Sequence, residues 1–180
     1  MKNAVKKVID NLPRLIPRVE SLTKKNLLVG VPQDETQRKE GEMTNATLAY
    51  IHDNGSPAAN IPARPFMQPG IKSVKPKLKL IYKKIALGIL HGEEEALDKG
   101  YERAGLIAQA AIRAAINEGI PPPLKDSTLR NRIRKGTAIK GAKLELEARG
   151  DGSSAGMEFA KPLVATAQMR NSINYVIRKK

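Results

Sequence analysis

Apolar residues recur every three to four positions in two long stretches of this chain, which predicts two long helices. The first helix is expected from Gly70 to about His91, with a kink or a late start at Pro76. The second is expected to begin within residues 92–100, to end near Gly119 and to be mostly buried. The polar positions of this second helix fall on one wedge of the helical wheel: Arg103, Gln109, Arg113 and Asn117.

Shorter helices are predicted near both ends of the chain. Residues 4–22 carry an apolar stripe that prolines interrupt, so we expect a helix that ends near Asn11 and a short turn after it. Thr44 should cap a helix over residues 45–53, and Gly55 should end it in the left-handed conformation. Thr166 should cap a last turn over residues 167–172.

Two short apolar runs, Asn26–Val31 and Ile173–Ile177, have the composition and the bounding residues of strands. We expect both in the same sheet, with the long helices covering one face. The chain is therefore predicted to be an α+β protein, in which several helices pack on a small, mainly antiparallel sheet. Its length of 180 residues fits a single domain over residues 1–180.

Three segments are predicted to lack long regular structure. Residues 33–43 are polar and should form an exposed loop. Ser56–Pro69 carries several prolines and should lie extended, anchored by a buried Phe66. Residues 137–160 contain scattered glycines and are predicted to be an extended arm or a hairpin. Such long irregular segments are usually functional or disordered, and in an assembled ring they could become ordered against neighbouring subunits.

Composition narrows the chemistry that this chain can perform. Cysteine is absent, and His52 and His91 lie far apart, so no metal centre and no cofactor is expected. No catalytic set or phosphate-binding glycine loop stands out, and Glu93, Glu94 and Glu95 fit a helix start. We expect no enzyme. Neither a signal peptide nor a membrane-spanning stretch is recognised, so a membrane association is not expected.

The formal net charge of +14 favours a polyanionic partner. Lysines without any acid fill the helix after Gly70, and arginines fill a short helix over residues 128–135, capped by Asp126 or Ser127. These stretches could contact DNA phosphates or acidic protein surfaces, or they could simply be solvated. The candidate contacts are Lys72, Lys75, Lys79, Lys83, Arg130, Arg132, Arg134 and Lys135. The proline-rich segment supplies the interface candidates Pro62, Arg64, Pro65 and Phe66.

Together, four segments resemble the tail-completion and head–tail joining proteins of tailed phages, a group of virion morphogenesis proteins. They are LAYIHDNGSP (48–57), IPARPFMQPGI (61–71), PPLKDSTLRNRIRKG (122–136) and KPLVATAQMRNSINYVI (161–177). The group usually has an acid before the threonine of the last segment and a glycine after it. This chain has Ala165 and Ala167 around Thr166.

The resemblance implies a structural subunit of the virion, assembled in the host cytoplasm, at the neck or at the top of the tail. It implies a homo-oligomeric ring, a hexamer or a dodecamer, that contacts the head–tail connector and the tail tube or tail terminator. DNA would pass through its lumen with non-specific contacts. The alternative that the residues leave open is a basic cytoplasmic nucleic-acid-binding protein, which would use the same basic helices to grip phosphate.

Overall fold

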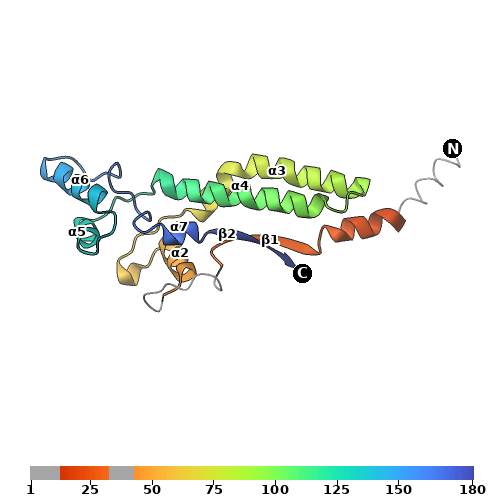
Figure 1. The fold of residues 1–180 in the computed structure, drawn as a ribbon, viewed down its shortest axis with the longest axis horizontal. Helices are drawn as coiled ribbons and strands as arrows, with labels where there is room; N and C mark the ends of the chain where they lie inside the picture. The colour runs from red at the N-terminus through yellow and green to blue at the C-terminus, as the bar shows by residue number, and fades with distance from the viewer. Residues whose placement is uncertain (1–12, 33–42) are drawn as a thin grey trace. The chain divides into compact units, whose positions relative to one another are not determined.

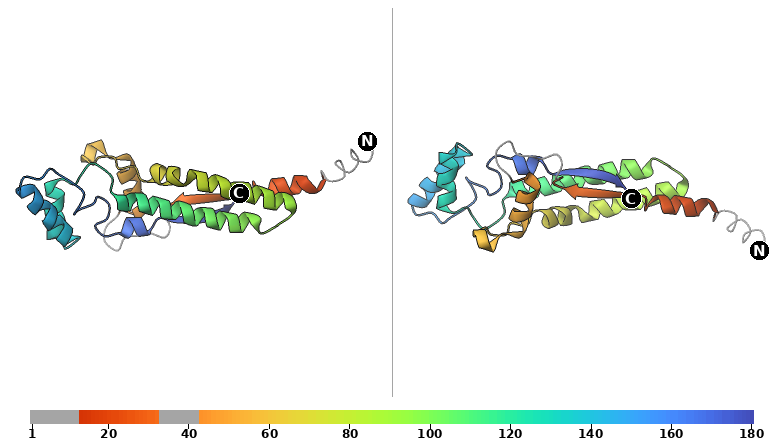
Figure 2. Two further views of the ribbon diagram at one scale, coloured as in Figure 1. Left: turned by 90° about the horizontal axis from the view of Figure 1, so that it is seen from above. Right: turned by 90° about the horizontal axis from the view of Figure 1, so that it is seen from below.

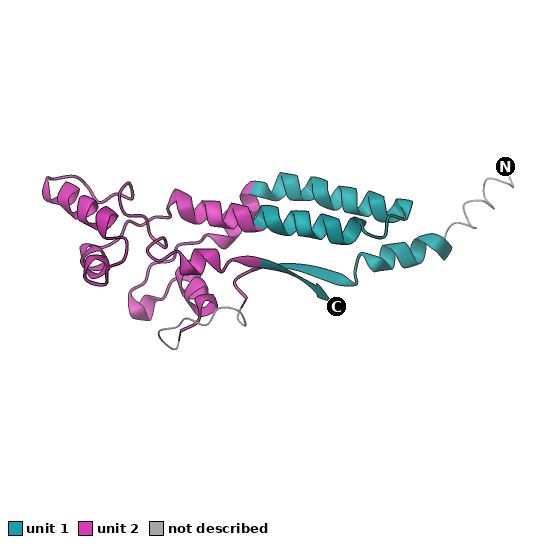
Figure 3. Cartoon of the chain, in the orientation of Figure 1, with its two compact units in different colours: residues 1–29, 74–108, 175–180 teal, residues 30–73, 109–174 magenta. Residues whose placement is uncertain are grey.

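The structure is a computed structural model that describes residues 13–32 and 43–180, and it has an α+β fold (Figure 1). The predicted fold class is confirmed. The chain forms two compact units, each built from segments that are distant in sequence (Figure 3). Unit 1 comprises residues 1–29, 74–108 and 175–180, and unit 2 comprises residues 30–73 and 109–174. The predicted exposed loop over residues 33–43 falls outside the described residues, except for the exposed Met43.

Unit 1 holds most of the strand pair. Strand β1 (Lys25–Gly30) pairs with β2 (Asn174–Lys179) in a two-stranded antiparallel sheet. The prediction that these two runs share a sheet is therefore confirmed. Ahead of β1, residues 13–21 are helical although Pro13 and Pro17 lie within them, so the predicted short turn is wrong there. The predicted end of a first helix near Asn11 lies outside the described residues.

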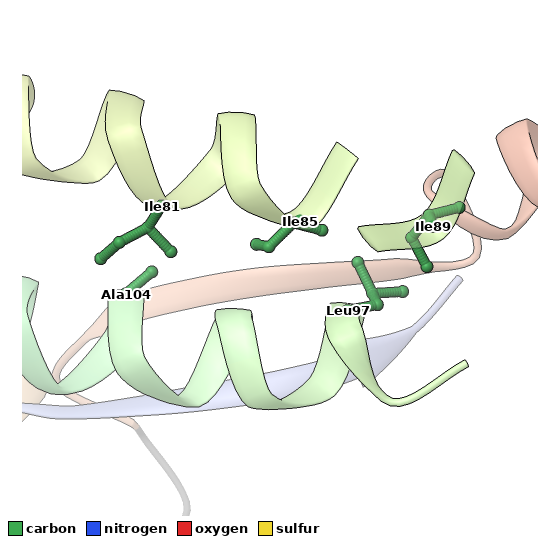
Figure 4. Packing of buried hydrophobic residues seen from close by; sticks show 5 residues of the cluster. All are labelled: Ile81, Ile85, Ile89, Leu97 and Ala104. Carbon is green, nitrogen blue, oxygen red and sulfur yellow. The ribbon is translucent and has the colours of Figure 1, made fainter. Parts of the chain in front are cut away.

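The core of unit 1 forms where helices α3 (Met67–His91) and α4 (Ala96–Glu118) face each other. Figure 4 shows that side chains of the two helices meet between them, and the buried set is Ile81, Ile85, Ile89, Leu97 and Ala104. Leu27 of β1 packs against this cluster, so the helices cover one face of the strand pair, as predicted. Gly100 allows the close approach, because a Cβ atom there would lie 2.1 Å from Ile85 Cγ1.

The two long helices differ in detail from what their sequences predict. Helix α3 begins at Met67, three residues before Gly70, and continues past Pro76 to His91. Helix α4 is not mostly buried, because a single stripe is covered while Leu106 is 55% exposed. Two residues of the polar wedge of α4, Gln109 and Arg113, bond to other parts of the chain. Gln109 Nε2 donates to the Ile173 carbonyl at 2.8 Å, and Arg113 Nη2 donates to the Asn171 and Ile173 carbonyls.

Unit 2 is built from short helices and irregular chain around the adjoining ends of α3 and α4. Helix α2 (Asn45–Asn54) is capped by Thr44, whose side chain accepts from the Thr47 amide, as predicted. Gly55 ends the helix with a positive φ of 81°, but its ψ of 170° lies outside the left-handed conformation that was expected there. The remaining helices are the 3-10 turn η1 (Pro57–Ala59), α5 (Asp126–Arg134), α6 (Ile139–Gly150) and α7 (Gln168–Asn171). The views in Figure 2 place α5 and α6 side by side.

The predicted arm over residues 137–160 is wrong for residues 139–150, which form α6. This helix packs on α5 through a second core of Leu124, Leu129, Ala142 and Ala160. A Cβ atom at Gly141 would lie 2.2 Å from the Phe159 carbonyl oxygen, so the returning chain presses directly on α6. The pair thus buries a core of its own inside unit 2.

Two predicted helix caps are also wrong. The residue that caps α5 is Lys125, without a side-chain hydrogen bond, so neither Asp126 nor Ser127 has that role. Asp126 instead forms an ion pair with Arg149 of α6 at 2.6 Å. The cap of α7 is Ala167, which has a φ of 56°, and no side-chain cap from Thr166 is present.

Candidate anion-binding pocket and basic surfaces

The proline-rich segment between α2 and α3 is fixed to the end of α2 by hydrogen bonds. The Arg64 amide donates to the His52 carbonyl at 2.8 Å. The carboxylate of Asp53 accepts from the amides of Phe66 and Met67, at 2.7 and 3.1 Å. Asp53 therefore supplies an acceptor to amides at the start of α3, where the backbone of the helix offers none.

The segment is only partly extended. Ser56 and Ile61 form a short antiparallel bridge around η1, so the chain turns back here and is not extended as predicted. Pro69 lies in the first turn of α3, a position where its missing amide costs little. Phe66 is fully buried, as predicted. The chain between Ile61 and Met67 thus works as a packed strap, and below it is called the strap (residues 61–67).

Unit 2 contains a pocket of about 510 Å³ beside the strap. Its lining comes from α2, the strap, the chain around α5 and the segment before α7. Most of the lining is apolar, and His52, Asn60, Lys125, Thr128 and Thr166 are its polar residues besides two arginines, Arg64 and Arg132. The apolar lining residues are Leu48, Ile61, Pro62, Pro122, Pro123, Leu124, Pro162, Leu163, Ala165 and Met169.

Both pocket arginines are buried, with exposed fractions of 6% for Arg64 and 8% for Arg132. Arg64 Nη2 donates to the Pro122 carbonyl at 2.8 Å, and Arg132 Nη2 donates to the Lys161 carbonyl at 3.1 Å. Burial lowers the pKa of Arg64. The pKa of Arg132 is lowered by burial and further by the positive charge of Arg64. Two buried guanidinium groups therefore line one largely apolar pocket.

Arg149, in the same unit, is an arginine whose positive charge is balanced by carboxylates. Its guanidinium bonds the Glu145 carboxylate at 2.8 Å and the Asp126 carboxylate at 2.6 Å. Burial alone would lower the pKa of Arg149, but these two carboxylates raise it overall. Within residues 13–32 and 43–180, neither Arg64 nor Arg132 has a carboxylate at ion-pair distance. The pocket arginines lack the compensation that Arg149 has.

The predicted basic cluster of α5 separates into two groups. Arg130, Arg134 and Lys135 are exposed, and Arg134 Nη2 donates to Asn131 Oδ1 at 2.9 Å. Arg132 does not belong to this surface, because its side chain turns inward to the pocket. A sequence signal for this exists, since Arg132 follows the buried Leu129 by three residues and so shares its helix face.

The lysines of α3 form an exposed stripe. Lys72, Lys75, Lys79 and Lys83 lie within roughly 80° of one another around the helix, at about 100° per residue. Opposite them on the wheel are the buried Ile81 and Ile85. The stripe is therefore a solvent-facing surface, suited to contact with a polyanion.

The interface candidates in the strap divide between surface and interior. Pro65 is exposed and Pro62 is partly buried in the pocket wall, whereas Arg64 and Phe66 are buried within the subunit. Sequence reasoning missed the role of Asp53, although its place in the H-D-x-G run before a proline-rich strap was a usable signal. It also missed that Arg64 and Arg132 line the same pocket.

No cluster of three or more histidine, aspartate or glutamate side chains that could hold a metal ion is present among the described residues. The same part of the chain contains no helix long and apolar enough to cross a membrane. Comparison with protein-family models, with curated proteins and with solved structures finds no match for this chain.

Proposed function

We propose that this chain is a structural, non-enzymatic subunit of a tailed-phage particle, located at the head–tail neck or the top of the tail. In this role it forms a homo-oligomeric ring, six-fold or twelve-fold, that joins the head–tail connector to the tail tube or terminator and surrounds the DNA path. The proposal begins from the resemblance of four segments to tail-completion proteins, and it assigns no chemical step to the chain.

The observation that carries the proposal is that these four segments form one hydrogen-bonded set. The strap bonds the end of α2 through Asp53 and His52, and Arg64 bonds Pro122 ahead of α5. Arg132 of α5 in turn bonds Lys161 in the last segment. All four segments contribute to the lining of one pocket. Motifs spread over more than a hundred residues thus have a shared structural reason to occur together, which an accidental resemblance does not supply.

Exposed apolar side chains are candidate contacts in the assembled state that we propose. On the helices of unit 1, Leu80 is 64% exposed and Leu106 is 55% exposed, and Tyr50 of α2 in unit 2 is 71% exposed. A contiguous patch of such side chains would mark a surface that a partner covers, whereas single exposed side chains are normal on a protein surface. The basic α3 stripe would meet either DNA in the lumen or acidic faces of neighbouring proteins.

The decisive experiment deletes the gene from the phage genome that encodes it and images the lysate by electron microscopy. The expected result is filled heads and finished tails that remain separate, and their joining on addition of the purified chain. Mass spectrometry of complete virions should detect the protein at a copy number that is a multiple of six. Intact, infectious particles formed without the gene product would overturn the proposal.

Self-association can be tested separately by sedimentation of the purified chain. Leu80→Ser removes an exposed apolar side chain from α3 and is expected to weaken oligomer formation while the melting temperature stays unchanged. Lys84→Ser, also exposed on α3, is the matched control and should leave association intact. A monomer at all concentrations, both alone and in lysates that contain heads and tails, contradicts the ring.

The second candidate is a basic nucleic-acid-binding protein, which the exposed α3 stripe favours. In that case the purified chain should bind a short DNA duplex tightly as a small species. Each phosphate contact should contribute about −0.9 to the slope of log K against log salt. Retention of DNA at physiological salt, together with normal virion assembly in the deletion phage, would favour this alternative.

A further inference from the structure

The pocket of unit 2 holds two buried positive charges that the described part of the chain does not neutralise. Arg64 and Arg132 line it together and are each more than nine-tenths buried. Taking an ion out of water costs several kcal/mol unless a counter-charge and hydrogen bonds compensate for it. Each guanidinium has one carbonyl partner, Pro122 for Arg64 and Lys161 for Arg132, and carbonyls do not cancel a full charge.

Arg64 also has unused hydrogen-bonding capacity. Its Nε is buried and finds no acceptor among the described residues. An arginine offers five N–H donors in a planar fork, and only one bond of this side chain is made within the described chain. Buried donors without a partner usually indicate an ion, a water or a ligand that completes the site. The missing partner is therefore an acceptor with negative charge.

The walls of the pocket restrict which anion fits. Apart from the arginines they are mainly aliphatic and proline side chains, such as Leu48, Ile61 and Met169. The volume of about 510 Å³ lies within the range of pockets that hold small organic ligands. A bare inorganic ion would meet the arginines but leave the apolar walls in contact with water. A doubly charged phosphate would in addition lose more hydration than a carboxylate on entering such walls.

We propose that this pocket binds a carboxylate carried on an apolar body, with Arg64 and Arg132 as the two groups that hold the carboxylate. The apolar body lies against the aliphatic and proline walls. The same chemistry is offered by a free aliphatic acid and by an acidic side chain flanked by apolar residues in a protein segment. The site goes beyond the proposed neck role and does not depend on it.

The test is calorimetric titration and thermal shift of the full-length chain with matched probes. Hexanoate should bind at least about tenfold more tightly than acetate, because each methylene that leaves water strengthens binding by roughly fourfold. The blocked peptides acetyl-Leu-Glu-Leu-amide and acetyl-Leu-Gln-Leu-amide test the protein source. Binding of the Glu peptide alone identifies an acidic side chain as the natural occupant, and binding of hexanoate alone identifies a free acid.

Two kinds of variant test the location. Arg132→Gln should reduce hexanoate or Glu-peptide binding by at least about tenfold, whereas Arg130→Gln, exposed on the same helix, should not change it. If Arg132→Gln does not fold, Ala165→Leu provides a second test. It narrows the pocket while both arginines are kept, and it should abolish binding in a folded protein. Binding that survives Ala165→Leu unchanged overturns the proposal. So does inorganic phosphate that binds as tightly as hexanoate, or a folded wild-type protein that binds none of these probes.

Discussion

Asp53 Oδ1 lies 2.7 Å from the backbone nitrogen of Phe66 and accepts its amide hydrogen, and it also accepts from Met67 at 3.1 Å. Asp53→Ala leaves both amides without an acceptor and should lower the free energy of unfolding by about 1–3 kcal/mol. Asp53→Asn keeps one acceptor oxygen and should cost less. Urea unfolding measures both, and hydrogen exchange at these two amides should be faster in Asp53→Ala. An unchanged exchange rate would show that the carboxylate does not hold the start of α3.

The two phenylalanines of the chain form a matched pair for a packing test. Phe66 is completely buried, whereas Phe159 is 43% exposed. Phe66→Ala should lower the free energy of unfolding by about 3–5 kcal/mol, because it leaves a cavity beside α3. Phe159→Ala should cost clearly less. Thermal unfolding of the two variants side by side checks the difference, and equal losses would argue that the strap repacks around the deletion.

Ala167 has a φ of 56° at the start of α7, in the left-handed region that alanine rarely adopts. This is the position where the tail-completion group usually has glycine. Ala167→Gly should therefore raise the free energy of unfolding by up to about 1 kcal/mol, because glycine relieves the left-handed strain. Ala165→Gly is the control, since Ala165 has no positive φ and should gain nothing. A gain of the same size at both positions would contradict the explanation.

Glu145 couples the stability of the α5–α6 pair to pH. Burial alone would raise its pKa, but hydrogen bonds from the Gly156 amide and from Arg149 outweigh burial and lower it overall. A carboxylate with a lowered folded pKa stabilises the fold above its unfolded pKa of about 4.3, and this stabilisation is lost as the pH falls through the folded value. The melting temperature should therefore fall below about pH 4.

Glu145→Gln should reduce the fall in melting temperature at acid pH. At neutral pH it should lower the free energy of unfolding by about 3 kcal/mol, because Arg149 then loses a buried partner. Glu147→Gln, exposed on the same helix, is the control and should follow the wild-type pH profile. Melting curves from pH 3 to pH 7 for the three proteins provide the comparison. Parallel curves for wild type and Glu145→Gln would contradict the assignment.

Replacing Arg130 and Arg134 together by Glu reverses two positive charges and should leave the fold stable, because both side chains are exposed. Adding Arg132→Glu should unfold α5, since it puts a carboxylate in the place of a buried guanidinium bonded to Lys161. Where Arg130 and Arg134 contact DNA phosphates, their double reversal should reduce the salt slope of binding by about 2. Where they meet acidic neighbours, the same variant should bind DNA as before and fail in particle assembly.

Local rules predicted the elements whose sequences agree with their surroundings. Thr44 caps α2 as expected, and two short apolar runs, Asn26–Val31 and Ile173–Ile177, pair as strands. Helix α6 was missed because its residues alternate crudely and because glycines lie both within it and beyond its end. Its stability comes from contacts outside the helix, such as the Gly156 amide on Glu145 and the close passage of Phe159 over Gly141. Tertiary packing of this kind overrides local propensity.

The candidate site was predictable only in part. A lone phenylalanine between prolines correctly indicated a buried anchor at Phe66. The run around Arg132 suggested a uniformly basic surface, because charge composition does not distinguish the two faces of a short helix. Arg64 and Arg132 line one pocket although they are far apart in sequence, and no spacing rule in a single chain reveals such an arrangement.

The interleaved construction of the two units has a consequence for inheritance. Unit 1 draws on residues at both ends of the chain and in the middle, and unit 2 draws on the intervals between them. A recombination crossover at any single point between residues 30 and 174 would therefore give a hybrid in which at least one unit combines segments from two parents. The two units should consequently evolve as one linked block, and their surfaces should change together rather than be exchanged as modules.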